Sequence, residues 1–85
     1  INTSSENLKI YPNPSQGKIY LNHKYFPNNR IILAKIFDAL GQLVFSKEIN
    51  NNTVDLSKLK NGMFYIKLNF DSNTITKKII LNKSE

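Results

Sequence analysis

Apolar and polar residues alternate in short runs along the whole chain, and no stretch of eleven or more residues carries its apolar positions at helical spacing. In the clearest run, residues 63–70, four apolar side chains fall on one side and Lys67 and Asn69 on the other. Turn residues separate the runs at intervals of about ten positions. The expected strands cover residues 8–11, 18–22, 31–37, 42–49, 53–56, 63–70 and 74–81. This pattern predicts an all-β fold, a seven-stranded antiparallel immunoglobulin-like β-sandwich.

A chain of 85 residues is long enough for one small domain with a single core. Strands this short and this few do not enclose a ligand-holding barrel, which takes about eight strands. The sequence has no phosphate-binding loop and no nucleophile elbow, and two of its six carboxylates, Asp38 and Asp71, sit at turn starts where a local capping role explains them. We therefore expect no enzyme, no catalytic residue and no cofactor. It has no Cys and one histidine, His23, so we also expect no metal site.

The three glycines each fall in a turn signal. Gly17 ends a Pro-Asn-Pro-Ser-Gln-Gly segment that follows the first strand. Asp38 and Gly41 occupy the first and fourth positions of a segment that favours a type I turn and should close a hairpin. Gly62 follows residues 57–60, which are long enough for one helical turn, and can supply the left-handed residue that ends such a turn.

The strand after the Asp38 turn poses a problem of register. Leu43, Phe45 and Ile49 are expected on one face of this strand, with Val44 on the other. Reconciling these positions calls for a β-bulge, which adds one unpaired residue to a strand.

The net charge of +6 raises the question of a nucleic-acid partner, because clustered Lys and Arg bind phosphates. The lysines here are scattered singly, and Lys77 and Lys78 are the one adjacent pair, so we expect solvated strand faces and no nucleic acid. The longest apolar runs, residues 31–34 and 63–66, are far shorter than the roughly 20 residues of a membrane helix. We therefore expect no direct membrane span.

Several ordinary features occur in an informative order. Tyr11-Pro12-Asn13-Pro14-Ser15-Gln16-Gly17 is followed by residues 36–44, then by residues 54–62, an aromatic-rich strand, and Thr76-Lys77-Lys78-Ile79-Ile80. This series resembles the C-terminal sorting domain, type A, of the type IX (Por) secretion system of Bacteroidota. The resemblance covers residues 8–82. It makes residues 1–7 a linker and residues 83–85 a tail.

The resemblance implies a non-catalytic, immunoglobulin-like domain at the end of a larger exported protein. It implies that outer-membrane type IX secretion components recognise the domain in the periplasm, and that a cell-surface sortase-like protease commonly removes it at the linker. The carrier would then stay at the cell surface or leave the cell. Together, the motifs assign the sorting signal to Tyr11, Pro12, Asn13, Pro14, Gly17, Asp38, Gly41, Gly62, Lys77, Lys78 and Ile79.

One departure and one alternative accompany this interpretation. The family usually has Gly, one residue and then Tyr, whereas here Gly62 and Met63 are followed by Phe64, which alternation places inward. For recognition, we expect the final strand with Lys77 and Lys78 to be available for strand addition. The alternative is a fibronectin-like or carbohydrate-binding accessory module, which would use exposed aromatic residues at Tyr20, Tyr25 or Phe26.

Overall fold

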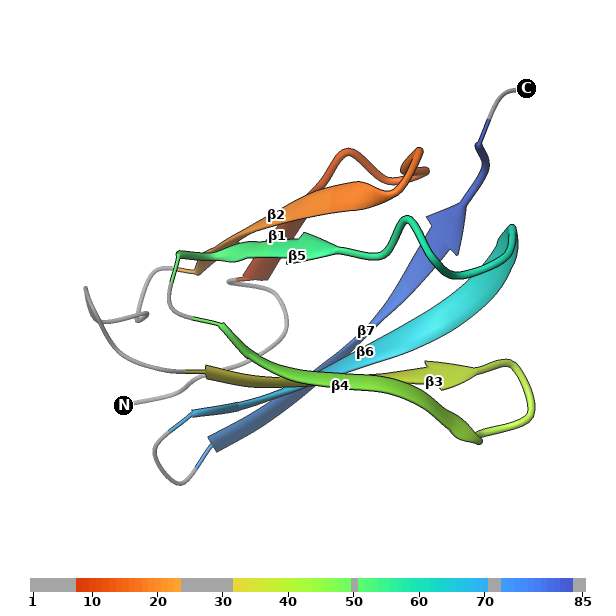
Figure 1. The fold of residues 1–85 in the computed structure, drawn as a ribbon. Helices are drawn as coiled ribbons and strands as arrows, with labels where there is room; N and C mark the ends of the chain where they lie inside the picture. The colour runs from red at the N-terminus through yellow and green to blue at the C-terminus, as the bar shows by residue number, and fades with distance from the viewer. Residues whose placement is uncertain (1–7, 24–31, 50, 71–72, 84–85) are drawn as a thin grey trace.

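The computed structural model describes residues 8–23, 32–49, 51–70 and 73–83, and they form two antiparallel β-sheets with no helix (Figure 1). The strands are β1 (Leu8–Tyr11), β2 (Lys18–His23), β3 (Ile32–Asp38), β4 (Leu43–Ile49), β5 (Thr53–Asp55), β6 (Gly62–Phe70) and β7 (Asn73–Leu81). One sheet has the order β1-β2-β5 and the other the order β4-β3-β6-β7. The predicted linker, residues 1–7, lies outside the described residues, as do Tyr25 and Phe26.

The strand predictions are confirmed to within one residue at each end. The reason is that most strands have a period-two pattern and each begins or ends at or next to Gly, Pro, Asn or Asp, so that local sequence largely fixes the length of each strand. In Figure 1 the two sheets form two layers, with β1, β2 and β5 in one and the four longer strands in the other.

A single core lies between the layers and draws on both sheets. Its members come from alternate positions of the strands, as the pleat requires. The buried apolar residues are Leu8, Ile19, Leu21, Ile32, Ala34, Ile36, Ile49, Val54, Leu56, Phe64, Ile66, Leu68, Ile75, Ile79 and Leu81. Phe64 points into this core and Tyr65 is exposed, as alternation predicts.

The turn between β3 and β4 has the predicted form. The Gly41 N–H donates to the Asp38 carbonyl oxygen at 2.9 Å, and Asp38 Oδ1 accepts from the N–H groups of Leu40 and Gln42, each at 2.9 Å. Gly41 has φ +85°, the left-handed conformation that follows a type I turn in a three-residue hairpin loop. Asp38 therefore has a local structural role in this turn.

The predicted bulge is also present, but it changes the place of Leu43. Ile36 pairs with Phe45 and Phe37 pairs with Leu43, so that Val44 is the extra residue of β4. Since Ile36 is buried, its neighbour Phe37 lies on the outer face, and Leu43 lies there too, 53% exposed. The expectation that Leu43 shares the inner face with Phe45 and Ile49 is wrong, because the bulge reverses the alternation at this point.

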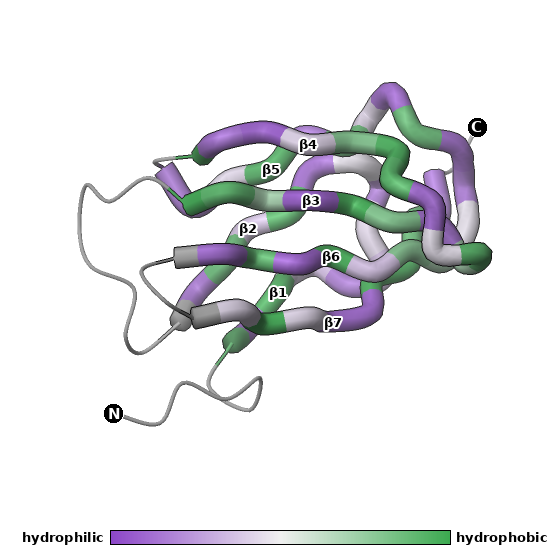
Figure 2. Tube along the Cα trace, turned by 90° about the horizontal axis from the view of Figure 1, so that it is seen from below, coloured by the Kyte–Doolittle hydropathy of each residue, from purple (hydrophilic) through white to green (hydrophobic). Residues whose placement is uncertain are grey.

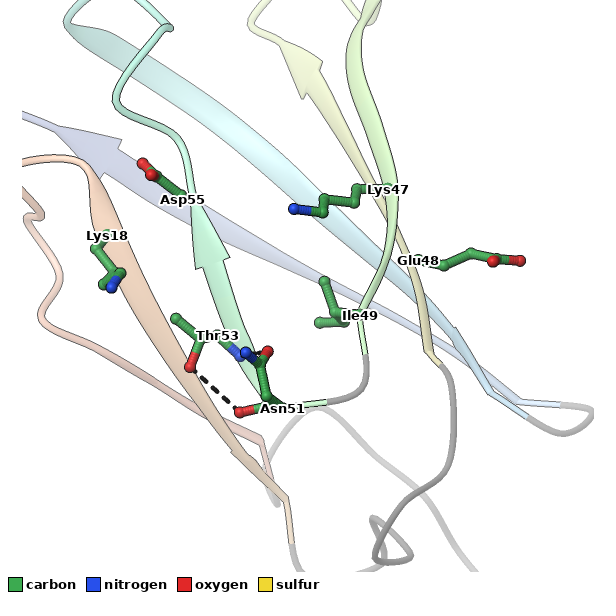
Figure 3. A pocket seen from close by; sticks show the side chains of 7 residues that line it. All are labelled: Lys18, Lys47, Glu48, Ile49, Asn51, Thr53 and Asp55. Atoms are coloured by element: carbon green, nitrogen blue, oxygen red, sulfur yellow. Dashed lines mark hydrogen bonds between the residues drawn. The ribbon is translucent and has the colours of Figure 1, made fainter.

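Both edges of the four-stranded sheet carry a lysine on the inner face. On β7, Lys77 falls at the same parity as the buried Ile75 and Ile79 and is half-buried. On β4, Lys47 falls at the parity of Phe45 and Ile49 and points toward the other layer (Figure 3). An added strand would bury these charges, so each lysine disfavours edge-to-edge pairing with another chain.

Candidate recognition site on the last strand

The segment between β1 and β2, here called the motif loop (residues 12–17), lies along the outer edge of β7. The Ser15 N–H donates to the Ile80 carbonyl oxygen and the Asn82 N–H donates to the Ser15 carbonyl oxygen, both at 2.8 Å. These bonds form a parallel bridge between Ser15 and Leu81. The loop that follows the first strand therefore extends the sheet beside the end of the last strand.

The side chain of Asn13 continues this pairing. Asn13 Oδ1 accepts from the Ile80 N–H at 3.0 Å, and Asn13 Nδ2 donates to the Lys78 carbonyl oxygen at 3.2 Å. A side-chain amide presents one acceptor and one donor in the way that a peptide group does. Asn13 thus takes the place of a backbone unit of a neighbouring strand.

Ser15 is buried, with 1% of its surface exposed, and its hydrogen-bonding capacity is used within the domain. Its Oγ donates to the Lys18 carbonyl oxygen at 2.9 Å and accepts from the Gly17 N–H at 3.0 Å. These bonds fix the turn that brings the backbone of Ser15 to β7. Ser15 is absent from the residues that the resemblance assigns, and its position in a Pro-Asn-Pro-Ser-Gln-Gly segment gives no sign of burial.

Gly17 holds the other side of the motif loop against the segment that follows β5. Its carbonyl oxygen accepts from the Leu56 N–H at 2.6 Å. A Cβ atom at this position would lie 3.3 Å from both Cα and Cβ of Ser57, and the φ of Gly17 is +142°. Glycine is needed here for close approach as well as for its backbone conformation.

The end of the chain's described part is held by a second side-chain amide. Asn61 Oδ1 accepts from the Lys83 N–H at 2.8 Å, and Asn61 Nδ2 donates to the Lys83 carbonyl oxygen at 3.4 Å. Lys83 Nζ donates to the carbonyl oxygens of Ser57 and Leu59. Side chains from two separate loops thus hold the last strand and the residues just after it.

The remaining predicted site residues serve several separate roles. Gly62 is the first residue of β6 and pairs with Leu81, so it lies beside the bridge to Ser15. Ile79 is a core residue, 1% exposed. Asp38 and Gly41 act within their own turn, while Lys78 is exposed on the outer face of β7. The structure therefore brings the motif loop together with the end of β7.

Tyr11, the aromatic residue at the start of the motif, lies on the outer face of the three-stranded sheet. It pairs with Tyr20 across β1 and β2, and the two rings stack with their centroids 5.7 Å apart. Tyr11 and Tyr20 are 51% and 41% exposed. The pair stabilises the β1–β2 hairpin through a cross-strand contact.

The position of the motif loop limits strand addition at β7. In an antiparallel strand, alternate residues direct their N–H and C=O groups to opposite edges. On β7, the residues whose N–H and C=O groups point to the free edge of the sheet are those at the parity of Ile80. The motif loop occupies this edge from Lys78 to Asn82. An incoming strand could pair with Thr74 and Thr76, at the other end of β7, and could not extend along the whole strand.

A shallow groove of about 270 Å³ lies between the β4 and β5 edges of the two sheets (Figure 3). Lys18, Lys47 and Asp55 are among the residues that line it, while Glu48 points away. The hydroxyl and then the backbone N–H of Ser57 hold the pKa of Asp55 below its usual value, because both hydrogen bonds favour the ionised carboxylate. Asp55 is thus engaged in a local turn with Ser57.

Among the described residues, no group of three or more His, Cys, Asp or Glu side chains is placed to hold a metal ion. These residues also contain no helix that is long and apolar enough to cross a membrane.

Comparison with known proteins gives one result. The family model described as "Secretion system C-terminal sorting domain" matches residues 9–82, which is most of the chain. A search of curated proteins found no match. The matched region begins within β1 and ends one residue after β7, so it includes both the motif loop and the strand edge on which that loop lies. The chain belongs to the family of secretion system C-terminal sorting domains.

Proposed function

We propose that the folded domain is the sorting signal of a larger exported protein. We further propose that the motif loop, by binding to β7, holds this signal in the conformation that the secretion machinery recognises. The family match makes the chain a C-terminal sorting signal for the type IX secretion system, whose cargo reaches the cell surface or the extracellular space. In this proposal the signal depends on the contact between the motif loop and β7.

The observation that carries this proposal is the set of hydrogen bonds from Asn13 and Ser15 to β7. These bonds join a motif near the start of the domain to a strand at its end. Loss of these bonds would free the edge of β7 from Lys78 to Asn82, while Asn61 would still hold Lys83. A signal built this way is complete only in the folded domain.

We also propose that the domain is immunoglobulin-like and of type A, from a Bacteroidota protein. The strand orders β1-β2-β5 and β4-β3-β6-β7 support the fold assignment. They correspond to strands A-B-E and C′-C-F-G of immunoglobulin-type sandwiches, with the fourth strand at the edge of the second sheet. The type and source rest on the motif series of the sequence.

In this proposal the direct partners are outer-membrane type IX components, which read the folded domain in the periplasm. A cell-surface sortase-like protease then cuts within residues 1–7. The polar composition of this segment supports the cleavage site, because accessible polar segments at domain ends are preferred sites of proteolysis.

Export of a reporter tests the proposal. A periplasmic reporter followed by the 85-residue chain is produced in cells with and without the type IX apparatus, beside the same reporter without the chain. We expect surface or extracellular reporter only when both the chain and the apparatus are present. Retention of the folded fusion in cells with the apparatus, or export in cells without it, would contradict the proposal.

A further inference from the structure

The outer face of the four-stranded sheet combines exposed apolar side chains with lysines. Of the eight large apolar side chains that are exposed among the described residues, six lie on this face or in its adjoining turn and bulge. They are Leu40, Leu43, Val44, Met63, Tyr65 and Ile80. Figure 2, which views the molecule from the side of this sheet, shows apolar segments gathered at the end of β3 and β4 near their turn.

The strand register joins these residues into one surface. Phe37 pairs with Leu43 on one side and with Tyr65 on the other, and Met63 pairs with Ile80 in the next outward row. Side chains opposite one another in a sheet lie about 5 Å apart. The apolar residues therefore form a continuous patch across all four strands.

Three lysines border this patch. Lys35 pairs directly with Lys67, and Lys78 pairs with Tyr65, diagonal to Lys67. Like charges directly opposite each other destabilise a sheet. Among the described residues the one carboxylate that the register places on this outer face is Glu48, at the parity of Leu33 and one row beyond Lys35. The face therefore carries an excess of positive charge.

The outer face of the other sheet differs in this respect. There Lys18 pairs directly with Asp55, so that an opposite charge compensates it. On that sheet Lys9 pairs with the neutral Asn22, whereas the like-charge pair of Lys35 and Lys67 lies on the same face as the exposed apolar patch.

We infer that the outer face of the four-stranded sheet, centred on Tyr65 and bordered by Lys35, Lys67 and Lys78, docks onto an acidic, partly apolar surface of a protein of the secretion machinery. Carboxylates on the partner would compensate the lysines. The aromatic side chains and Met63 are of the kinds enriched in the centres of protein interfaces. The inference rests on the proposed sorting function and deepens it.

Charge argues against a second copy of this chain as the occupant, and the form of the surface argues against a membrane. A second copy of this face would bring lysines against lysines. Membrane-surface binding typically uses an amphipathic helix with a wide apolar side, whereas this face is a sheet whose central apolar residues, Met63 and Tyr65, are each 37% exposed.

The motif loop connects to this surface. Asn13 binds the carbonyl oxygen of Lys78 and the N–H of Ile80. The side chains of Lys78 and Ile80 belong to the β7 part of the docking face. The motif thus positions part of the docking surface without belonging to it.

The test compares two double variants that change the net charge equally. Lys67→Glu with Lys78→Glu alters the docking face and replaces the like-charge pair at Lys35 by an opposite-charge pair. Lys9→Glu with Lys58→Glu alters exposed positions elsewhere. We expect the first variant to reduce surface delivery of the reporter by about tenfold or more, while its thermal midpoint stays at or above that of the unchanged chain. The second should be delivered like the unchanged chain.

Equal delivery of both variants would overturn the inference and leave the sorting function intact. Failure of the unchanged chain to be delivered would instead overturn the proposed function, and the inference with it. Two measurements on the purified chain address the other occupants. Sedimentation velocity tests for a dimer, and flotation with phosphatidylglycerol vesicles tests for membrane binding. If the Lys67→Glu and Lys78→Glu changes abolish a dimer, the face binds a second copy; if they abolish flotation, it binds a membrane. Either result would contradict the acidic protein partner.

Discussion

Asn13 and Ile80 are 67 positions apart in the sequence, yet Asn13 Oδ1 accepts a hydrogen bond from the Ile80 N–H at 3.0 Å. The same amide donates to Lys78, two residues earlier on the strand. The motif loop therefore completes the edge of the last strand, and its residues act on the signal by holding β7. We therefore expect substitutions in the motif loop to change the structure of the β7 edge.

The hydroxyl of Ser15 should contribute to stability out of proportion to its size. Ser15→Ala leaves the Gly17 N–H and the Lys18 carbonyl oxygen without their partner at a buried site. We expect a loss of about 1–3 kcal/mol in the free energy of unfolding, measured with urea. Ser46→Ala, at an exposed position of β4, should change it by less than about 0.5 kcal/mol. Similar values for the two variants would contradict the role given to Ser15.

The two turn glycines should differ in their tolerance of alanine. A Cβ at Gly41 would meet no atom within 4 Å, so Gly41→Ala should cost only the left-handed backbone, about 1–2 kcal/mol. A Cβ at Gly17 would press on Ser57 at 3.3 Å as well as straining the backbone, so Gly17→Ala should cost more, about 2–3 kcal/mol or above. Thermal unfolding of both variants gives the order, and the reverse order would show that the motif loop moves freely away from Ser57.

The carboxylate of Asp55 should make a small acid-sensitive contribution to stability. Its pKa in the folded chain lies below the usual value of 3.8, because Ser57 donates to the ionised form. A lowered folded-state pKa stabilises the fold above the unfolded-state pKa, and this contribution is lost as the pH falls through the folded-state pKa. The stability difference between the unchanged chain and Asp55→Asn should therefore shrink on acidification below pH 3.8. An NMR titration that places the Asp55 pKa above this value would contradict the prediction.

The inward lysines should keep the four-stranded sheet from pairing with other chains. Replacing Lys47 and Lys77 by Val removes the charges that an added strand would bury. We expect the double variant to self-associate in sedimentation velocity at concentrations where the unchanged chain is a monomer. The matched change of Lys9 and Lys58 to Val should have no such effect. A double variant of Lys47 and Lys77 that stays monomeric would show that other features protect the edges.

Local sequence predicts the strands and turns of this domain but leaves its long-range contacts open. The alternation around Phe64 and the Asp38–Gly41 turn each depend on neighbours within a few positions, so their structures follow from the sequence. The exposure of Leu43 depends on which residue of β4 is left unpaired, and the pattern of residues does not determine that.

The candidate site illustrates the same limit. The motif residues can be recognised as a group, but nothing in a single sequence pairs Asn13 with Ile80 or marks Ser15 as buried. The lysines of the outer face are likewise scattered along the chain and meet only through the register of β3, β6 and β7.

Surface delivery of a reporter carrying Asn13→Asp tests the central claim most directly. The change keeps the acceptor for Ile80 and removes the donor to Lys78, so it weakens the hold of the motif loop on β7 with almost no change in shape. Asn51→Asp is the matched control, because among the described residues Asn51 uses its side chain only through Oδ1, as acceptor for the Thr53 N–H, and it lies away from the docking face. In cells with the type IX apparatus, we predict a large loss of delivery for Asn13→Asp and normal delivery for Asn51→Asp. Normal delivery of Asn13→Asp would contradict the claim that the signal depends on this contact.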